Sequence, residues 1–378
     1  MVSFLTAEQP FMWTLPQDEW MVTPPALMAA TPVGATTIGR LRDSSTTFFK
    51  NVVLPVPALP VRKILRPVFS TKSHAVSNSL FCSMGAKVRF FIEKSYNKPK
   101  KPYLCNGKLD KQSTMVSTMI KPKLQYYPMG GGVTAFSTMR QGGYSRGNYG
   151  EFNINRYCGD EQDAIRKNRE ALCHLLGITD DHLLMPHQVH LTETAVVDET
   201  FLCKTAEERQ QALEGVDALM TDRKGVCIGV STADCIPILL YDPVHHAVCA
   251  IHAGWRGTVK RITEQAVKKM TATYGSRPAD MIAQIGPGIS LDSFEVGDEV
   301  YEAFQQEGFP MEQISRRDEK WHINLPECNR QQLLSTGIPD SQISTSTVCT
   351  VKQSDIFFSA RRLGINSGRI FTAIILHQ

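Results

Sequence analysis

Short runs of apolar residues, rich in valine, isoleucine and threonine, recur through the last two thirds of this chain. Such runs, bounded by glycine, proline or charged residues, are typical of β-strands that pack in a core. The pattern predicts strands at residues 132–140, 193–198, 217–222, 226–234, 237–242, 247–253, 281–286, 343–348 and 370–376.

Between groups of these strands, apolar residues recur every three or four positions, which is the spacing of an amphipathic helix. Asp160 is a suitable N-cap for one helix, which is expected to end at Gly177. Thr258 is expected to open a second helix that ends at Gly275. Smaller helices are expected near residues 204–214, 297–307 and 324–335.

Strands grouped in hairpins, with helices between the groups, predict an α+β fold rather than a doubly wound sheet. We expect a layered sandwich of mixed β-sheet with flanking helices. The chain has no Gly-x-Gly-x-x-Gly motif after a strand and no phosphate-loop lysine motif, which disfavours dinucleotide or ATP binding.

The first part of the chain has no lasting helical or strand period, and prolines interrupt it repeatedly. It ends near the basic run Lys98-Pro-Lys-Lys-Pro102, whose composition is typical of an extended linker. Residues 1–118 are therefore interpreted as an irregular, disordered extension, as the product of a start assigned upstream of the true initiator, or as a small module of unknown type. Residues 119–378 are expected to form a single catalytic domain.

Charge divides the chain in the same way. Residues 1–120 hold 15 Lys and Arg against 6 Asp and Glu, whereas the remainder holds 26 against 31, and the net charge is +4. Because the expected catalytic part is not basic, we do not expect nucleic-acid binding. No apolar stretch approaches the roughly 20 residues that cross a bilayer, so we expect no membrane insertion.

Cysteine usage points to a reducing compartment. The ten cysteines are scattered and form no Cys-x-x-Cys pair, so disulfides are not expected. Acidic residues near the start argue against a transit peptide, and a cytoplasmic location follows as the expectation. Whether the protein is a monomer or a dimer stays open.

One cysteine and two histidines form the strongest candidate site. Cys235 begins one predicted strand and His252 ends a later one, so a hairpin-like return brings both to one end of a sheet. His190 closes the segment Met-Pro-His-Gln-Val-His. Three soft ligands on separate elements are typical of a zinc site that keeps one position free. The alternative for Cys235 is a buried structural cysteine.

The neighbours of these residues also indicate a site. Asp234 stands in an otherwise small or apolar run, and a carboxylate rarely occurs there without a task. Ala253 and Gly254 allow close backbone packing, and Trp255 and Arg256 indicate substrate recognition beside a metal site.

The motifs around these residues resemble the purine nucleoside phosphorylase family formerly described as laccase-like multicopper polyphenol oxidases, whose bacterial members are also called peptidoglycan editing factors. The matching segments are Phe136-Ser-Thr-Met-Arg-Gln-Gly-Gly-Tyr-Ser-Arg-Gly147, Phe152-Asn153, Gly159-Asp160, Asn168-Arg169, Gln188-Val-His190, Gly215-Val-Asp-Ala218, Thr232-Ala-Asp-Cys235, His252-Ala-Gly-Trp-Arg-Gly257, Ile285-Gly-Pro287, Glu295-Val-Gly297, Phe358-Ser-Ala-Arg-Arg362 and Gly368-Arg369.

The resemblance implies phosphorolysis of purine nucleosides (inosine, guanosine, adenosine and 5′-methylthioadenosine) and deamination of adenosine. Purine nucleoside and phosphate would be the partners and zinc the cofactor, with His190, Cys235 and His252 as ligands. These three residues, Asp234 and Arg140 are the expected catalytic residues. Arg256 and Arg362, like Arg140, are expected to contact anionic groups. Asn153 and Gln188 are expected to position the substrate.

Other functions stay open. Cys235 as nucleophile and His252 as base would make an amide hydrolase acting on a peptidoglycan precursor. Copper binds most nitrogen and sulfur sites more tightly than zinc, so an adventitious copper or a single-copper polyphenol oxidase is another alternative. A four-copper laccase centre is not expected, because it needs many ligands arranged in His-x-His pairs and this chain has none. A protein partner with a vestigial site is the remaining hypothesis.

Overall fold

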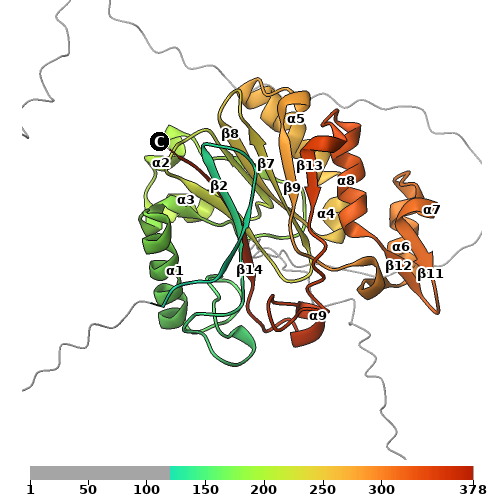
Figure 1. The fold of residues 1–378 in the computed structure, drawn as a ribbon, viewed down its shortest axis with the longest axis horizontal. Coiled ribbons are helices and arrows are strands. Elements are labelled where there is room, and N and C mark those ends of the chain that lie inside the picture. Colours follow the sequence, from blue (N-terminus) through green and yellow to red (C-terminus); the bar gives the residue numbers. More distant parts are fainter. Residues whose placement is uncertain (1–119, 378) are drawn as a thin grey trace, which may run out of the picture. The chain divides into compact units, whose positions relative to one another are not determined.

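The computed structural model describes residues 120–377 of the 378-residue chain. The interpretation of residues 1–118 therefore lies outside the described residues. Two sheets pack face to face at the centre of the described part (Figure 1).

The first sheet has five strands in the order β1-β2-β14-β6-β3. Its strands are β1 (Leu124–Tyr127), β2 (Val133–Thr138), β14 (Ile370–Leu376), β6 (Cys227–Thr232) and β3 (Leu183–Leu184). The second sheet has six strands in the order β13-β9-β7-β8-β5-β4. These are β13 (Ile343–Thr345), β9 (Ile282–Ile285), β7 (Ile236–Asp242), β8 (Ala247–Ala253), β5 (Ala218–Thr221) and β4 (Thr194–Val196). Both sheets mix parallel and antiparallel pairs.

Alternating side chains explain the layers, because successive residues of a strand face opposite sides of the sheet. In β7, Leu239 and Tyr241 pack toward the five-stranded sheet, in a core that includes Val230 and Ile374. Leu240, which lies between them in the chain, belongs to the core on the other face of its sheet.

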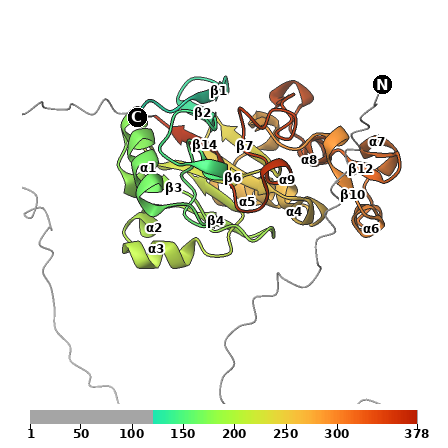
Figure 2. The ribbon, with the colours of Figure 1, turned by 90° about the horizontal axis from the view of Figure 1, so that it is seen from below.

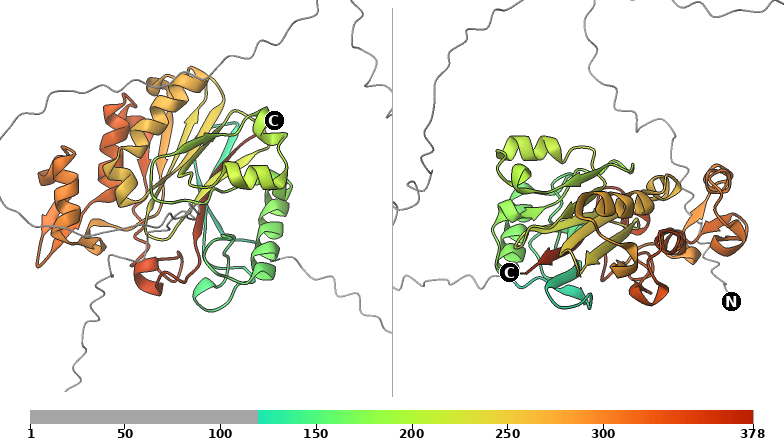
Figure 3. Two further views of the ribbon diagram at one scale, coloured as in Figure 1. Left: turned by 180° about the vertical axis from the view of Figure 1, so that it is seen from behind. Right: turned by 90° about the horizontal axis from the view of Figure 1, so that it is seen from above.

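Helices cover the two outer faces (Figures 1 and 3). Helix α1 (Gln162–Leu176) packs Leu172 against Phe136 and Phe371 of the five-stranded sheet. Helices α5 (Ile262–Tyr274) and α8 (Leu325–Ser335) cover the six-stranded sheet. The described part is thus a helix–sheet–sheet–helix sandwich, and the predicted α+β class is confirmed.

A small three-stranded sheet lies beyond α8, toward one end of the described part (Figure 2). It consists of β10 (Glu295–Val296), β12 (Trp321–Ile323) and β11 (Ser315–Arg317), with α6 (Asp298–Gln306) and α7 (Met311–Ile314) beside it. The remaining helices are α2 (Glu199–Leu202), α3 (Ala206–Ala212), α4 (Trp255–Val259) and α9 (Ala360–Leu363). None of the helices within residues 120–377 is long and apolar enough to cross a membrane.

Every predicted strand is present, with ends that differ by a few residues. The three-stranded sheet, β1 and β3 were not predicted, because strands of two to four residues are too short to show a period. The small helices α3, α6 and α8 confirm the expected ones.

Two predicted helix starts are wrong. The N-cap of α1 is Glu161, because the Asp160 carboxylate is used in buried hydrogen bonds from Ser145 Oγ (2.6 Å) and Asn153 Nδ2 (2.9 Å). The helix expected to open at Thr258 is divided, since α4 already begins at Trp255 and a left-handed Arg261 (φ 62°) separates it from α5.

Gly229 offers a test of the packing within the five-stranded sheet. A Cβ there would lie 2.5 Å from Phe371 Cζ and 2.6 Å from Ala373 Cβ. We expect Gly229→Ala to lower the free energy of unfolding by about 1–3 kcal/mol, the usual cost of overpacking. Gly131→Ala is the matched control, because a Cβ at Gly131 meets nothing within 4 Å. Urea denaturation measures the free energy of unfolding of both variants. Equal values for Gly229→Ala and Gly131→Ala would contradict the close packing at Gly229.

Candidate metal centre

The hairpin of β7 and β8 brings Cys235 and His252 together. Its register pairs Ile236 with Ala253 and Pro237 with His252, so Cys235, directly before β7, lies beside the end of β8. This confirms the hairpin-like return expected from the sequence. Cys235 stands in the short connection that leaves β6 of one sheet and enters β7 of the other. The pair therefore lies where the chain crosses between the two sheets.

His190 reaches the same place from the loop between β3 and β4. Its backbone is left-handed (φ 62°), a conformation that a non-glycine residue rarely adopts. The loop is held by the Asp217 carboxylate, which accepts backbone hydrogen bonds from Val189 (3.3 Å), His190 (3.0 Å) and Leu191 (2.8 Å). Three hydrogen bonds to one ionised group offset the strain of this turn.

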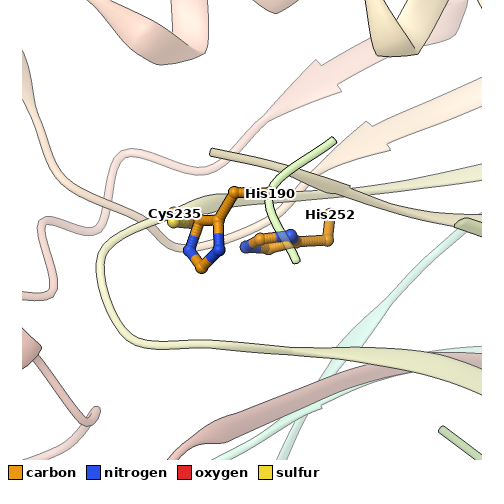
Figure 4. A group of neighbouring side chains, drawn as sticks. All are labelled: His190, Cys235 and His252. Atoms are coloured by element: carbon orange, nitrogen blue, oxygen red, sulfur yellow. The ribbon is translucent and has the colours of Figure 1, made fainter. Parts of the chain in front are cut away.

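The three side chains form one cluster (Figure 4). One ligand atom from each of His190, Cys235 and His252 lies within 4.8 Å of the others. The two imidazole rings meet edge to face, with centroids 4.8 Å apart and planes at 80°. His252 is buried and His190 is exposed, so the cluster has an inner and an open side. Within residues 120–377, no other group of His, Cys, Asp or Glu side chains has this ligand geometry.

Asp217 also orients His252. Its Oδ1 lies 2.7 Å from His252 Nδ1. Burial disfavours the charged carboxylate, but the hydrogen bond and charge of His252 and the backbone N–H groups outweigh burial and hold the pKa of Asp217 below its usual value. An ionised carboxylate only accepts hydrogen bonds, so Nδ1 donates and Nε2 is left to face the cluster. A carboxylate behind a ligand histidine is the usual outer partner of a metal site.

The charges at the site suit a metal ion. Burial would raise the pKa of the Cys235 thiol, but the charge of His252 and hydrogen bonds with His190 and His252 outweigh it and lower that pKa. The thiolate is the form that binds metal. Two imidazoles and one thiolate on separate elements match the three protein ligands of a catalytic zinc site. The residues present therefore fit zinc.

Gly254 is the reason that the ligands can approach each other. A Cβ at this position would lie 2.9 Å from His190 Cδ2 and 3.2 Å from Cys235 Sγ. Its φ is −70°, so the requirement is for space and not for an unusual backbone conformation. The expectation that glycine here lets the backbone pack closely is confirmed.

Asp234 lies next to Cys235, but its carboxylate is committed to two other segments. Oδ1 accepts a hydrogen bond from Thr350 Oγ1 (2.6 Å) and Oδ2 accepts one from the backbone N–H of Arg361 (2.7 Å). The backbone of Asp234 is left-handed, with φ 89°. The contacts tie the turn before Cys235 to α9 and to residue 350, and the catalytic role expected for Asp234 stays a prediction.

The two predicted positioning amides hold protein segments together. Asn153 is fully buried and donates to Asp160 Oδ2 (2.9 Å). Gln188 donates from Nε2 to the Ser231 carbonyl oxygen and accepts at Oε1 from the Ser231 backbone N–H, both at 2.8 Å. Gln188 thereby joins the His190 loop to the end of β6. Contacts of Asn153 and Gln188 with substrate stay predictions.

The three predicted anion-binding arginines share one property. None of Arg140, Arg256 and Arg362 has a salt bridge to a carboxylate among the described residues. Arg140 donates to the carbonyl oxygens of Gly150 and Ser354, both at 2.6 Å, and lines an open hollow of about 480 Å³. The three guanidinium groups thus have no ion-pair partner among the described residues, and their role as phosphate contacts stays a prediction.

Asp217 is the residue that sequence reasoning missed. It lies in the segment Gly215-Val-Asp-Ala218, which indicated only the resemblance to the family. A signal was present, because Asp217 directly precedes the apolar strand β5, much as Asp234 lies two positions before β7. Its partners, however, are backbone groups of a distant loop that no local pattern identifies.

Comparison with known proteins gives the family. A family model described as multi-copper polyphenol oxidoreductase laccase matches residues 134–377, which include all three clustered residues. The chain belongs to this family.

Relatives within the family carry enzyme names. A purine nucleoside phosphorylase of Bacteroides thetaiotaomicron is 47% identical over 249 residues, which cover 65% of this chain and 92% of the relative. Adenosine deaminase RL5, from an unknown prokaryotic organism, is 44% identical over 255 residues, covering 67% and 97%. The structure of YlmD from Geobacillus stearothermophilus matches with a TM-score of 0.63 and 29% identity, covering 69% of this chain and 99% of YlmD.

Asp217→Asn tests the support that this carboxylate gives to the cluster. We expect zinc affinity to fall about 10- to 100-fold, because Asn cannot provide the same charge and acceptors to His252 and the His190 loop. Asp222→Asn is the control, since Asp222 pairs with Arg223 at the surface. Competition with a chromogenic chelator measures the affinity, and circular dichroism checks the fold. Unchanged zinc affinity in a folded Asp217→Asn protein would contradict this role.

Proposed function

We propose that this protein is a zinc-dependent purine nucleoside phosphorylase that also deaminates adenosine. Its substrates would be inosine, guanosine, adenosine and 5′-methylthioadenosine, which react with phosphate to give the free base and the sugar 1-phosphate. The observation that carries the proposal is the cluster of His190, Cys235 and His252, whose three ligand atoms lie within 4.8 Å of one another. Relatives named purine nucleoside phosphorylase and adenosine deaminase support it.

Zinc is favoured over copper by the ligand set. The cluster offers three ligands with an open side at His190, as catalytic zinc sites do. When bound, zinc would supply a Lewis acid that lowers the pKa of water to about 7. A laccase centre instead needs His-x-His pairs, and the full sequence contains none. A single copper at the same three residues remains the alternative for a polyphenol oxidase, since copper binds such donors tightly.

Three arginines would supply the positive charge that the proposed reaction needs. Phosphate attacks C1′ of the sugar as the bond to the purine breaks, so the site needs positive charge near the attacking oxygen. Arg140, Arg256 and Arg362 carry charges that no near carboxylate neutralises among the described residues. Guanidinium groups bind phosphate oxygens through paired hydrogen bonds. We assign the phosphate contacts to these arginines.

One observation favours a second candidate function. The side chain of His252 lies between a thiol and a carboxylate: Cys235 could act as nucleophile, His252 as base and Asp217 as the carboxylate that orients the base. His252 Nδ1 lies 2.7 Å from Asp217 Oδ1. This is the arrangement of cysteine hydrolases. The second candidate is therefore an amide hydrolase that acts on a peptidoglycan precursor and needs neither zinc nor phosphate.

The deciding assay incubates purified full-length protein of known zinc content with inosine, with and without phosphate. We expect phosphate-dependent release of hypoxanthine and ribose 1-phosphate. Cys235→Ala should reduce kcat/KM by more than about 100-fold, because loss of a metal ligand costs more than loss of an outer partner. Cys203→Ser is the matched control, since Cys203 is an exposed thiol outside the cluster, and it should keep full activity.

Absence of hypoxanthine with zinc bound would contradict the phosphorylase proposal. Phosphate-independent hydrolysis of a peptidoglycan precursor, retained after zinc removal and lost in Cys235→Ala, would support the second candidate instead.

We also propose that residues 119–378 form the complete catalytic domain. All the residues of the metal centre, and the whole family match at 134–377, lie within this part. A protein that begins at Met119 should therefore keep the zinc content and the kcat/KM of the full chain within about twofold, a difference below 0.5 kcal/mol. Steady-state kinetics on both proteins measures this. An insoluble or inactive shortened protein would contradict the proposed boundary.

A further inference from the structure

Exposed apolar side chains gather around His190. Among the described residues, six large hydrophobic side chains are clearly exposed, and two of them, Val189 (41%) and Leu191 (42%), flank His190 directly. A third, Tyr157 (38%), contacts the same loop through His187. Single exposed apolar residues need no explanation, but a group beside a reactive cluster indicates a surface that a ligand covers.

Tyr157 and His187 form a stacked pair. Their ring centroids are 4.3 Å apart and their planes differ by 22°. Two further contacts hold His187 in place. Its Nδ1 lies 2.5 Å from Glu214 Oε1, and its backbone N–H donates to the Leu213 carbonyl oxygen (3.0 Å). The pair is therefore ordered, although both rings remain partly exposed.

Tyr157 is also tied to the segment that carries Cys235. Its backbone N–H donates to Asn155 Oδ1 (2.6 Å), and Asn155 Nδ2 donates to Ser231 Oγ (2.7 Å). Ser231 lies in β6, four positions before Cys235. A surface that is ordered before the ligand arrives loses little entropy on binding, and this raises affinity.

The stacked pair lies close to the metal centre. His187 and His190 are three residues apart, so their Cα atoms are at most about 11 Å apart. A nucleoside that spans a similar distance, with its sugar near the cluster, would bring its base to the His187 end of the same loop. Within residues 120–377 the Tyr157 hydroxyl makes no hydrogen bond, in contrast to the Tyr157 backbone N–H, so it is available to a ligand as well.

We propose that Tyr157, stacked on His187, binds the purine base of the substrate, with Val189 and Leu191 covering the edge of the bound base. The inference rests on the proposed function, because it assigns the base of that same substrate. A flat aromatic base stacks on an exposed tyrosine face, and such stacking contributes to affinity for any purine. This places base recognition on the His190 loop and on residue 157, apart from the arginines assigned to phosphate.

The test uses full-length, zinc-loaded protein. Tyr157→Ala should raise the Kd of inosine, measured by calorimetry, and the KM for inosine about 10-fold or more, because the stacking surface is lost. The KM for phosphate and the zinc content should stay unchanged. Tyr157→Phe keeps the ring and should retain most of the affinity. Tyr126→Ala is the control for loss of an exposed tyrosine (57%), on the edge strand β1, and should leave both constants unchanged.

Unchanged inosine affinity in Tyr157→Ala would overturn the assignment. Equal losses of inosine affinity, phosphate affinity and zinc would also overturn it, because they would show general damage to the site. The two proposals fail separately. If the unaltered protein carries out phosphorolysis and Tyr157→Ala has no effect, only the proposed base site is contradicted. If inosine binding depends on Tyr157 but no phosphorolysis occurs, the base site is supported and the phosphorylase function is contradicted.

Discussion

The cluster of His190, Cys235 and His252 depends on the hydrogen bonds that the Asp217 carboxylate accepts. This carboxylate is fully buried, where an unpaired charge would be costly, and it is stabilised by three backbone N–H groups and one imidazole. The same four hydrogen bonds set the left-handed turn at His190 and the ring orientation of His252. One group thus fixes two ligands that are 62 positions apart in the chain. The third ligand, Cys235, is brought to them by the hairpin of β7 and β8.

The sandwich provides the setting for these contacts. Where the chain passes from β6 to β7 it leaves one sheet and enters the other, and the turn at Asp234 and Cys235 lies in that crossing. Hydrogen bonds of polar side chains stabilise the crossing on both sides. Gln188 bonds to Ser231, and Asp234 accepts hydrogen bonds from Thr350 and Arg361. A crossing that is tied to two packed sheets positions Cys235 more precisely than a free loop would.

The laccase description of the family and the enzyme names of its members imply different chemistry. Our proposal follows the enzyme names, because one thiolate and two imidazoles, with a carboxylate behind one of them, could hold a single metal ion. The two candidate activities use the same atoms in different ways. With zinc, Cys235 is a ligand; without it, the Cys235, His252 and Asp217 order is that of a thiol hydrolase.

The sequence by itself determined most strands of the two large sheets, the α+β class and the three clustered residues, because apolar strand runs and the Gln-Val-His, Ala-Asp-Cys and His-Ala-Gly-Trp-Arg-Gly segments are local features. It did not determine the three-stranded sheet, β1 or β3, whose strands are too short to show a period. It also did not determine the start of α1, because the Asp160 carboxylate is used in buried hydrogen bonds. Only the tertiary structure decided the contacts of Asp217 and the stacking of Tyr157 on His187. Their partners lie on distant segments, and such contacts depend on packing that no single stretch of the chain encodes.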